Sequence, residues 1–154
     1  MITFFNDSHH THAPEFEFYL GERVPCFESP ARAEFVKTSL VTRGQGLQPA
    51  QVDNRPSGHH AGADFMDGYC FPNNAAVTAQ AVRNSAAARV AVLDVDTFAD
   101  DPISQFGPRA SDFTRLGQRL GQLGLPTVFV LEGGYAAAEL GHNAVNVIEG
   151  VEGV

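Results

Sequence analysis

Short apolar runs alternate along the chain with longer stretches whose apolar residues recur at helical spacing. The runs lie at Ile2–Phe5, Val90–Leu93 and Thr127–Leu131, and each one ends at polar or glycine-containing sequence. Apolar runs of this length bounded by turn residues are typical of buried strands. We therefore expect three strands.

Four other segments have the spacing of amphipathic helices. Their starts are marked by Ser29-Pro30, by Asn73 or Asn74, by Ser111 and by the turn that ends at Tyr135. Ser and Asn are good helix N-caps, and Pro suits the first helical position. The segment from Gly44 to Asn54 has no periodicity and few apolar residues, so we interpret it as a linker.

The alternation of strands and helices predicts an α/β layer fold with a small, mainly parallel sheet of about three strands flanked by helices. In open sheets of this kind, ligands bind beyond the carboxyl ends of the strands. The loops that begin at Asn6, Asp94 and Glu132 should therefore share one rim. This arrangement would bring Asp94, Asp96 and Tyr135 near one another.

Composition limits the classes of function. The chain has 154 residues, 44% of them hydrophobic and 18% charged, as expected for a single domain spanning residues 1–154. Its net charge of -8 disfavours nucleic acid as a partner, because such binding normally requires a basic surface. No apolar stretch approaches the roughly 20 residues that cross a bilayer. We expect a soluble cytoplasmic protein, with Cys26 and Cys70 as free thiols.

Two groups of histidines are candidates for chemistry. His59 and His60 lie in a Gly-rich loop, where adjacent imidazoles near an acid could carry out general acid–base catalysis near neutral pH. The alternative is that they are simply solvated loop residues. The spacing of His9, His10 and His12 could suggest a metal site, but with no helix to align them we favour a solvated or loop-packing role.

Two acids and a tyrosine follow the expected strands. Alternate residues of a strand point to opposite faces, so Asp94 and Asp96 would share one ion only if the backbone turns there. Asp94 could instead accept backbone N–H groups at the start of a loop. Tyr135 could offer its hydroxyl to a developing oxyanion or could fill space at the rim.

Several ordered motifs resemble the histone deacetylase superfamily, and more closely its bacterial acetylpolyamine amidohydrolase and class II-like branch. They are GERVPCFESPARAEF at residues 21–35, RPSGHHAG at 55–62, GYCFPNNAA at 68–76, VAVLDVD at 90–96, FADDPIS at 98–104 and EGGY at 132–135. The resemblance implies an arginase/deacetylase α/β fold. It also implies zinc-dependent hydrolysis of an acetyl-amide bond on lysine or a polyamine.

The resemblance further implies roles for individual residues. His59 and His60 match the tandem histidines of the family, the second of which usually acts as general base beside a zinc-bound water. Tyr135 matches the tyrosine that hydrogen-bonds the substrate carbonyl oxygen. Asp96 matches a zinc ligand, and Asp94 matches an acid that usually helps to hold a monovalent cation and to orient the metal site.

The zinc site departs from the family pattern. In the family a histidine ligand follows shortly after the second acid, whereas here Asp96 is followed by Thr97 and by sequence similar to a much later family segment. Asp96 thus matches two ligands at once, and the histidine ligand is absent. Deletions near residues 46–55 and at 96–97 would produce this pattern, as in a truncated, engineered core.

Two functions follow from these observations. The first is a minimised zinc-dependent deacetylase for a small acetylated amine or acetyl-lysine, with metal binding possible and catalysis weak or lost. The second is a non-catalytic scaffold or a dimeric metal-binding module. A trimmed sheet exposes strand edges and apolar faces, so we expect a homodimer.

Overall fold

The computed structural model describes residues 3–50, 73–85, 90, 92, 107–131 and 133–153. The chain divides into two compact units. One unit contains Met1–Asp53, Thr97–Thr127 and Gly134–Val154, and the other contains Asn54–Asp96 and Val128–Gly133. No helix in the described ranges is long and apolar enough to span a membrane.

The first unit contains a small parallel sheet. β1 (Thr3–Phe5) pairs with β4 (Leu47–Pro49). Just beyond the pair, the side-chain amide of Asn6 donates a hydrogen bond to the carbonyl oxygen of Ala50 at 3.1 Å. The strand expected at the start of the chain is confirmed. The interpretation of Gly44–Asn54 as a linker is wrong where β4 lies within it. A strand of three residues is too short to show a periodic pattern in the sequence.

An antiparallel hairpin in the same unit was not expected from the sequence. It is formed by β2 (Phe16–Tyr19) and β3 (Glu22–Pro25). The turn between them consists of Leu20 and Gly21, whose φ angles of 52° and 85° are both positive. Hairpin turns of this kind usually contain Asn-Gly or Asp-Gly, so Leu-Gly gives a weak signal.

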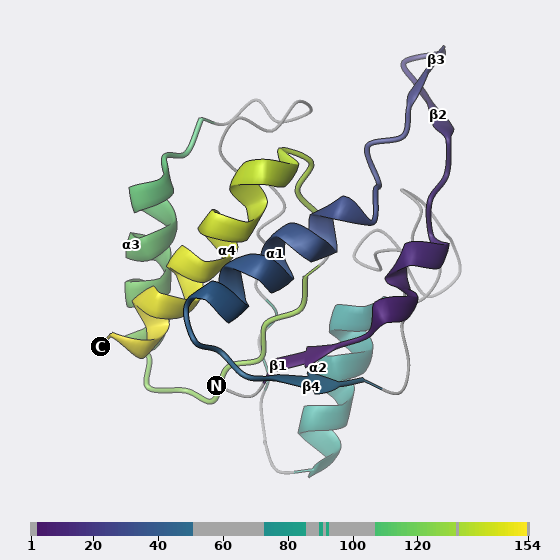
Figure 1. Ribbon diagram of the computed structural model, residues 1–154. Helices are drawn as coiled ribbons and strands as arrows, with labels where there is room; N and C mark the ends of the chain where they lie inside the picture. Colours follow the sequence, from purple (N-terminus) through teal and green to yellow (C-terminus); the bar gives the residue numbers. More distant parts are fainter. Residues whose placement is uncertain are drawn as a thin grey trace. The chain divides into compact units, whose positions relative to one another are not determined.

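Three helices of the first unit pack together (Figure 1). α4 (Ala137–Glu152) lies against both α1 (Ala31–Thr42) and α3 (Ala110–Gly121). All three helices were expected from the sequence. The apolar side chains that they bury are Ala33, Val36, Leu40, Phe113, Leu140, Val145 and Ile148.

The contact between α3 and α4 depends on two glycines. A Cβ atom added at Gly117 would overlap the carbonyl oxygen of Val147, and one added at Gly150 would overlap the carbonyl oxygen of Thr114. The two helix backbones therefore touch directly, which only residues without a side chain allow.

The start of α3 differs from the expectation. Ser111 is not the N-cap, because it lies inside the first turn and Arg109 precedes the helix. The Asp112 carboxylate accepts the backbone N–H of Arg109 at 2.7 Å, as the third residue of a capping box does. The carboxylate of Asp112 therefore determines where α3 begins, rather than the hydroxyl group of Ser111.

The described part of the second unit is mainly α2 (Asn74–Ser85). Asn73 caps this helix as expected, because its side-chain oxygen accepts the backbone N–H of Ala76 at 2.8 Å. Of the expected strand Val90–Leu93, only residues 90 and 92 are described, and neither is in a strand.

The strand expected at Thr127–Leu131 is wrong, since no residue of this run is in a strand. Val128, Phe129 and Val130 are 63%, 37% and 44% exposed, and the run pairs with none of the described strands. An apolar run signals burial, but it becomes a strand only when a neighbouring strand supplies the hydrogen bonds. The α/β class is nevertheless confirmed by the helices and the small parallel sheet.

Candidate functional site

Arg32 is the most deeply buried charged residue of the described chain, with 1% of its surface exposed. It forms an ion pair with Glu28, which is 3% exposed. Its Nε–H group donates a hydrogen bond to the carbonyl oxygen of Gly134 at 2.6 Å. A buried charge normally requires both a counter-ion and hydrogen bonds, and Arg32 has both. The first turn of α1 thus holds the backbone just before Tyr135.

Two aromatic contacts act on the side chain of Tyr135. The guanidinium carbon of Arg32 lies 4.8 Å from the centre of the Tyr135 ring, within the range of a cation–π contact. The Phe27 ring lies 6.0 Å away, at 51° to the Tyr135 ring. Gly134 has a φ of 93°, which favours glycine at the turn. Tyr135 is therefore positioned through its ring and through the preceding backbone.

This geometry suits a hydrogen-bond donor. A phenol held in one orientation can donate to an oxygen on which negative charge develops, without reorganisation during the reaction. Tyr135 is half-buried, so its side chain retains some access to the surface. A single phenol of this kind can assist hydrolysis, but the nucleophile and its base must come from other residues.

Tyr135 is the one predicted site residue in the described ranges. His59, His60, Asp94 and Asp96 lie outside the described residues, so their convergence with Tyr135 stays a prediction.

Sequence reasoning missed Glu28 and Arg32 as supporting residues. An acid and a base four residues apart across a Ser-Pro helix start could have indicated the pair. Such pairs are usually exposed, however, and nothing local indicates burial.

A second buried carboxylate lies near Cys26. The Cys26 thiol donates to Glu17 Oε2 at 3.2 Å, and the backbone N–H of Phe27 donates to the same oxygen at 3.1 Å. Burial, together with the hydrogen bond to Glu17, raises the pKa of the Cys26 thiol to about 11. Cys26 is a free thiol, as expected, and Cys70 lies outside the described residues.

The N-terminal histidines differ from the expectation of an irregular loop. η1, a 3₁₀ helix over Asp7–Thr11, follows β1, and the rings of His9 and His10 both reach Glu34. His9 is 1% exposed, so it is not a solvated loop residue. The Asn6 side chain accepts the backbone N–H of Ser8 at 2.8 Å and so caps this short helix.

Comparison with known proteins agrees with this fold. The histone deacetylase domain family matches residues 31–99. Acetylpolyamine amidohydrolase 1 of Pseudomonas aeruginosa is 31% identical over 79% of this chain, and amidohydrolase 2 of the same organism is 33% identical over 65%. A crystal structure of the acetylpolyamine aminohydrolase from Burkholderia pseudomallei superposes with a TM-score of 0.83, at 17% identity, over 98% of this chain and 98% of that chain.

The fold and the sequence matches together define a deacetylase-type α/β protein. The family match at residues 31–99 and the two Pseudomonas relatives show that the chain is similar to the histone deacetylase superfamily, as its motifs indicated. Its matches span 61% and 55% of the length of the two Pseudomonas relatives.

Proposed function

We propose that the chain is a reduced zinc-dependent deacetylase, of the type that hydrolyses an acetylated polyamine or acetyl-lysine, with lowered metal affinity and slow hydrolysis. The observation that carries the proposal is the anchoring of Gly134 and Tyr135 by Arg32. This costly buried arrangement fixes the one residue whose family role is to contact the substrate carbonyl.

Each catalytic residue has a distinct role in this proposal. The Tyr135 hydroxyl donates a hydrogen bond to the amide carbonyl oxygen as negative charge develops there. His60 accepts a proton from the attacking water and returns it to the leaving amine, and His59 stabilises the charge on His60. The small acetylated amine that the curated relatives' names indicate is the substrate we propose for this chain.

Asp96 and Asp94 are the proposed metal residues. Zinc held there would polarise the amide carbonyl and lower the pKa of a bound water. Catalytic zinc normally has three protein ligands, and this sequence has no histidine directly after Asp96. We therefore propose that metal affinity is lower than three ligands would give, and that hydrolysis is correspondingly slow.

The alternative is a non-catalytic scaffold or a dimeric metal-binding module. The replacement of the expected histidine ligand by other sequence after Asp96 favours it. The two functions differ in whether substitution of Tyr135 or His60 changes any hydrolysis.

Metal content is the first test of the proposal. Chelator-stripped protein is reloaded with zinc and compared with the Asp96→Ala variant. Zinc bound by the parent and reduced by this substitution supports the metal assignment. Equal zinc content in both proteins would remove Asp96 from the site.

Hydrolysis of acetylputrescine and of an acetyl-lysine peptide is the second test. Tyr135→Phe should lower kcat about 100-fold, as removal of an oxyanion donor does. Tyr19→Phe is the matched control, because Tyr19 also contacts Phe27 but has no role assigned in the hydrolysis. His60→Ala should abolish turnover. Hydrolysis that neither substitution changes, or no hydrolysis by zinc-loaded parent protein, would favour the scaffold.

A further inference from the structure

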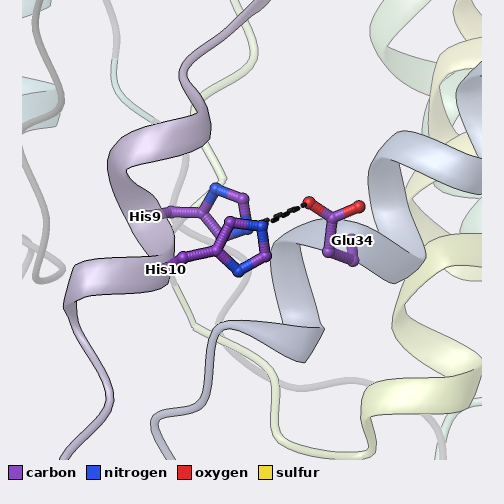
Figure 2. Close-up of side chains that lie close together, drawn as sticks. All are labelled: His9, His10 and Glu34. Carbon is purple, nitrogen blue, oxygen red and sulfur yellow. Dashed lines mark ion pairs between the residues drawn. The ribbon is translucent and has the colours of Figure 1, made fainter.

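Two histidines of η1 converge on one carboxylate oxygen of α1. His9 Nε2 lies 3.1 Å and His10 Nε2 lies 3.3 Å from the same Oε1 atom of Glu34. Figure 2 shows both imidazole rings directed at this carboxylate from one side. All three ligand atoms lie within 4.8 Å of one another. The group belongs to one compact unit and contains none of the residues assigned to hydrolysis.

The hydrogen bonding of His9 determines which ring nitrogen is available. Its Nδ1 lies 3.0 Å from the backbone carbonyl oxygen of Asn6, so in the neutral ring Nδ1 carries the proton. The lone pair of Nε2 then faces Glu34 Oε1. Both of these atoms are buried, and neither has a hydrogen-bond partner. Two facing acceptors in a buried position repel each other unless a cation lies between them.

A simple ion pair does not account for this arrangement. His9 Nε2 and Glu34 Oε1 lie at ion-pair distance, 3.1 Å, but no hydrogen bond forms between them, as a protonated His9 would be expected to make. A second imidazole, that of His10, is directed at the same oxygen although one counter-ion would suffice. The convergence of two imidazole nitrogens and a carboxylate oxygen is instead typical of a metal site.

We propose that His9, His10 and Glu34 bind a divalent transition-metal ion of the zinc class. Zinc with ligand bonds of about 2.0–2.1 Å in tetrahedral geometry keeps neighbouring ligand atoms about 3.3 Å apart. The two nitrogen–oxygen distances, 3.1 Å and 3.3 Å, agree with this spacing. The hydrogen bond from Nδ1 of His9 to a backbone carbonyl is the outer contact that usually orients a metal-bound histidine.

Lys37 sets a limit on the affinity of this site. Its ammonium lies 3.6 Å from Glu34 Oε1, where it competes with a cation for the same oxygen. Asp7 Oδ1 accepts a hydrogen bond from this ammonium at 3.0 Å and gives Lys37 an alternative partner. Removing the Lys37 charge should therefore strengthen metal binding, whereas a purely structural role of Glu34 predicts no such effect.

The test uses the untagged full chain carrying Asp94→Ala and Asp96→Ala, so that the metal residues of the proposed deacetylase site are absent. Zinc affinity is measured by competition with a chromophoric chelator. We expect about one zinc per chain. His10→Ala or Glu34→Gln should each weaken zinc binding at least tenfold, because even the loss of a contact that orients a metal ligand typically lowers metal affinity by about 10- to 100-fold. Lys37→Met should tighten binding.

The control is His142→Ala, because His142 is an exposed histidine of α4 outside the cluster. His10 is 59% exposed, so its removal should leave the fold intact, as circular dichroism would verify. No zinc binding in the doubly substituted background, or equal affinities of the His10→Ala and His142→Ala variants, would overturn the proposal. The zinc affinity measured in this background does not depend on the proposed deacetylase site, because Asp94 and Asp96 are both substituted.

Discussion

Arg32 and Gly134, which are 102 positions apart in the sequence, are joined by a hydrogen bond of 2.6 Å from a buried guanidinium to a backbone carbonyl oxygen. The bond connects the start of α1 to the turn that carries Tyr135. The position of Tyr135 therefore depends on Arg32, which is far from it in the sequence.

Substitution of Arg32 should be strongly destabilising. Arg32→Met leaves the Glu28 carboxylate buried without its cation, which typically costs about 3–5 kcal/mol in the free energy of unfolding. The double variant Glu28→Gln/Arg32→Met should lose less stability than Arg32→Met alone, because it leaves no buried charge without a partner. Urea denaturation of the parent, both single variants and the double variant measures the coupling. Additive losses would show that Glu28 and Arg32 act independently.

The glycine contact between α3 and α4 makes a separate prediction. Gly117→Ala and Gly150→Ala should each lower the free energy of unfolding by about 1–3 kcal/mol, because the new methyl group would overlap a backbone carbonyl of the other helix. This loss exceeds the gain in helix propensity that alanine normally brings. Gly46→Ala is the control, since nothing lies within 4 Å of a Cβ at that position. Equal unfolding midpoints for all three variants would contradict the close approach.

The helices could be predicted from the sequence because their signals are local. Apolar spacing and capping residues identified α1, α2, α3 and α4, but two caps were wrong. Pro30 rather than Ser29 precedes α1, without a side-chain cap, and Arg109 rather than Ser111 precedes α3, where the side chain of Asp112 reaches back to the cap. The hairpin was missed because Leu20 occupies a turn position that usually has Asn or Asp. β4 was missed because its partner lies more than forty positions away in sequence, as Thr3 opposite Leu47 shows.

The candidate site could be predicted only in part, for the same reason. Tyr135 was identifiable from its place after an apolar run and a Gly-Gly turn. Its contacts with Arg32 and Phe27 depend on tertiary packing, which no local pattern encodes. The histidines of η1 were assigned to a loop because a single 3₁₀ turn has too few residues for periodicity.

The raised pKa of Cys26 predicts a slowly reacting thiol. With a pKa of about 11, only about one thiol in a thousand is ionised at pH 8. In a Cys70→Ser background, alkylation of Cys26 by iodoacetamide should therefore be about 100-fold slower than that of a free cysteine. Glu17→Gln should speed the reaction only partly, because burial is the larger cause of the shift. A rate equal to that of free cysteine in the folded protein would contradict this.

Asp112 should make stability depend on pH at the acid end. The backbone N–H of Arg109 and the Arg115 guanidinium hold the pKa of its carboxyl below the ordinary value of 3.8. The contribution of Asp112 to stability is therefore complete above this ordinary pKa, which the unfolded chain has, and is lost as pH falls through the lower pKa of the folded state. The Tm of the parent should exceed that of Asp112→Asn at pH 6, and the difference should shrink below pH 4. A difference that does not change with pH would exclude this origin.

Self-association is a further expectation from the sequence. Large apolar side chains remain exposed on the strands of the first unit, with Phe4 at 64% and Phe18 at 72%. Exposed apolar groups and unpaired strand edges favour association. Light scattering at high concentration should give about twice the chain mass of 16.5 kDa. A monomer mass throughout the concentration range would contradict a homodimer.

The glycines at the crossing of α3 and α4 also restrict how the two helices can move. Sliding α3 by a turn, about 5.4 Å, in one direction would bring Phe113 to the point where Gly117 now meets Gly150. Sliding it in the other direction would bring Gly121, which also has no side chain. The glycines of α3 therefore oppose displacement of the helix more strongly in one direction than in the other.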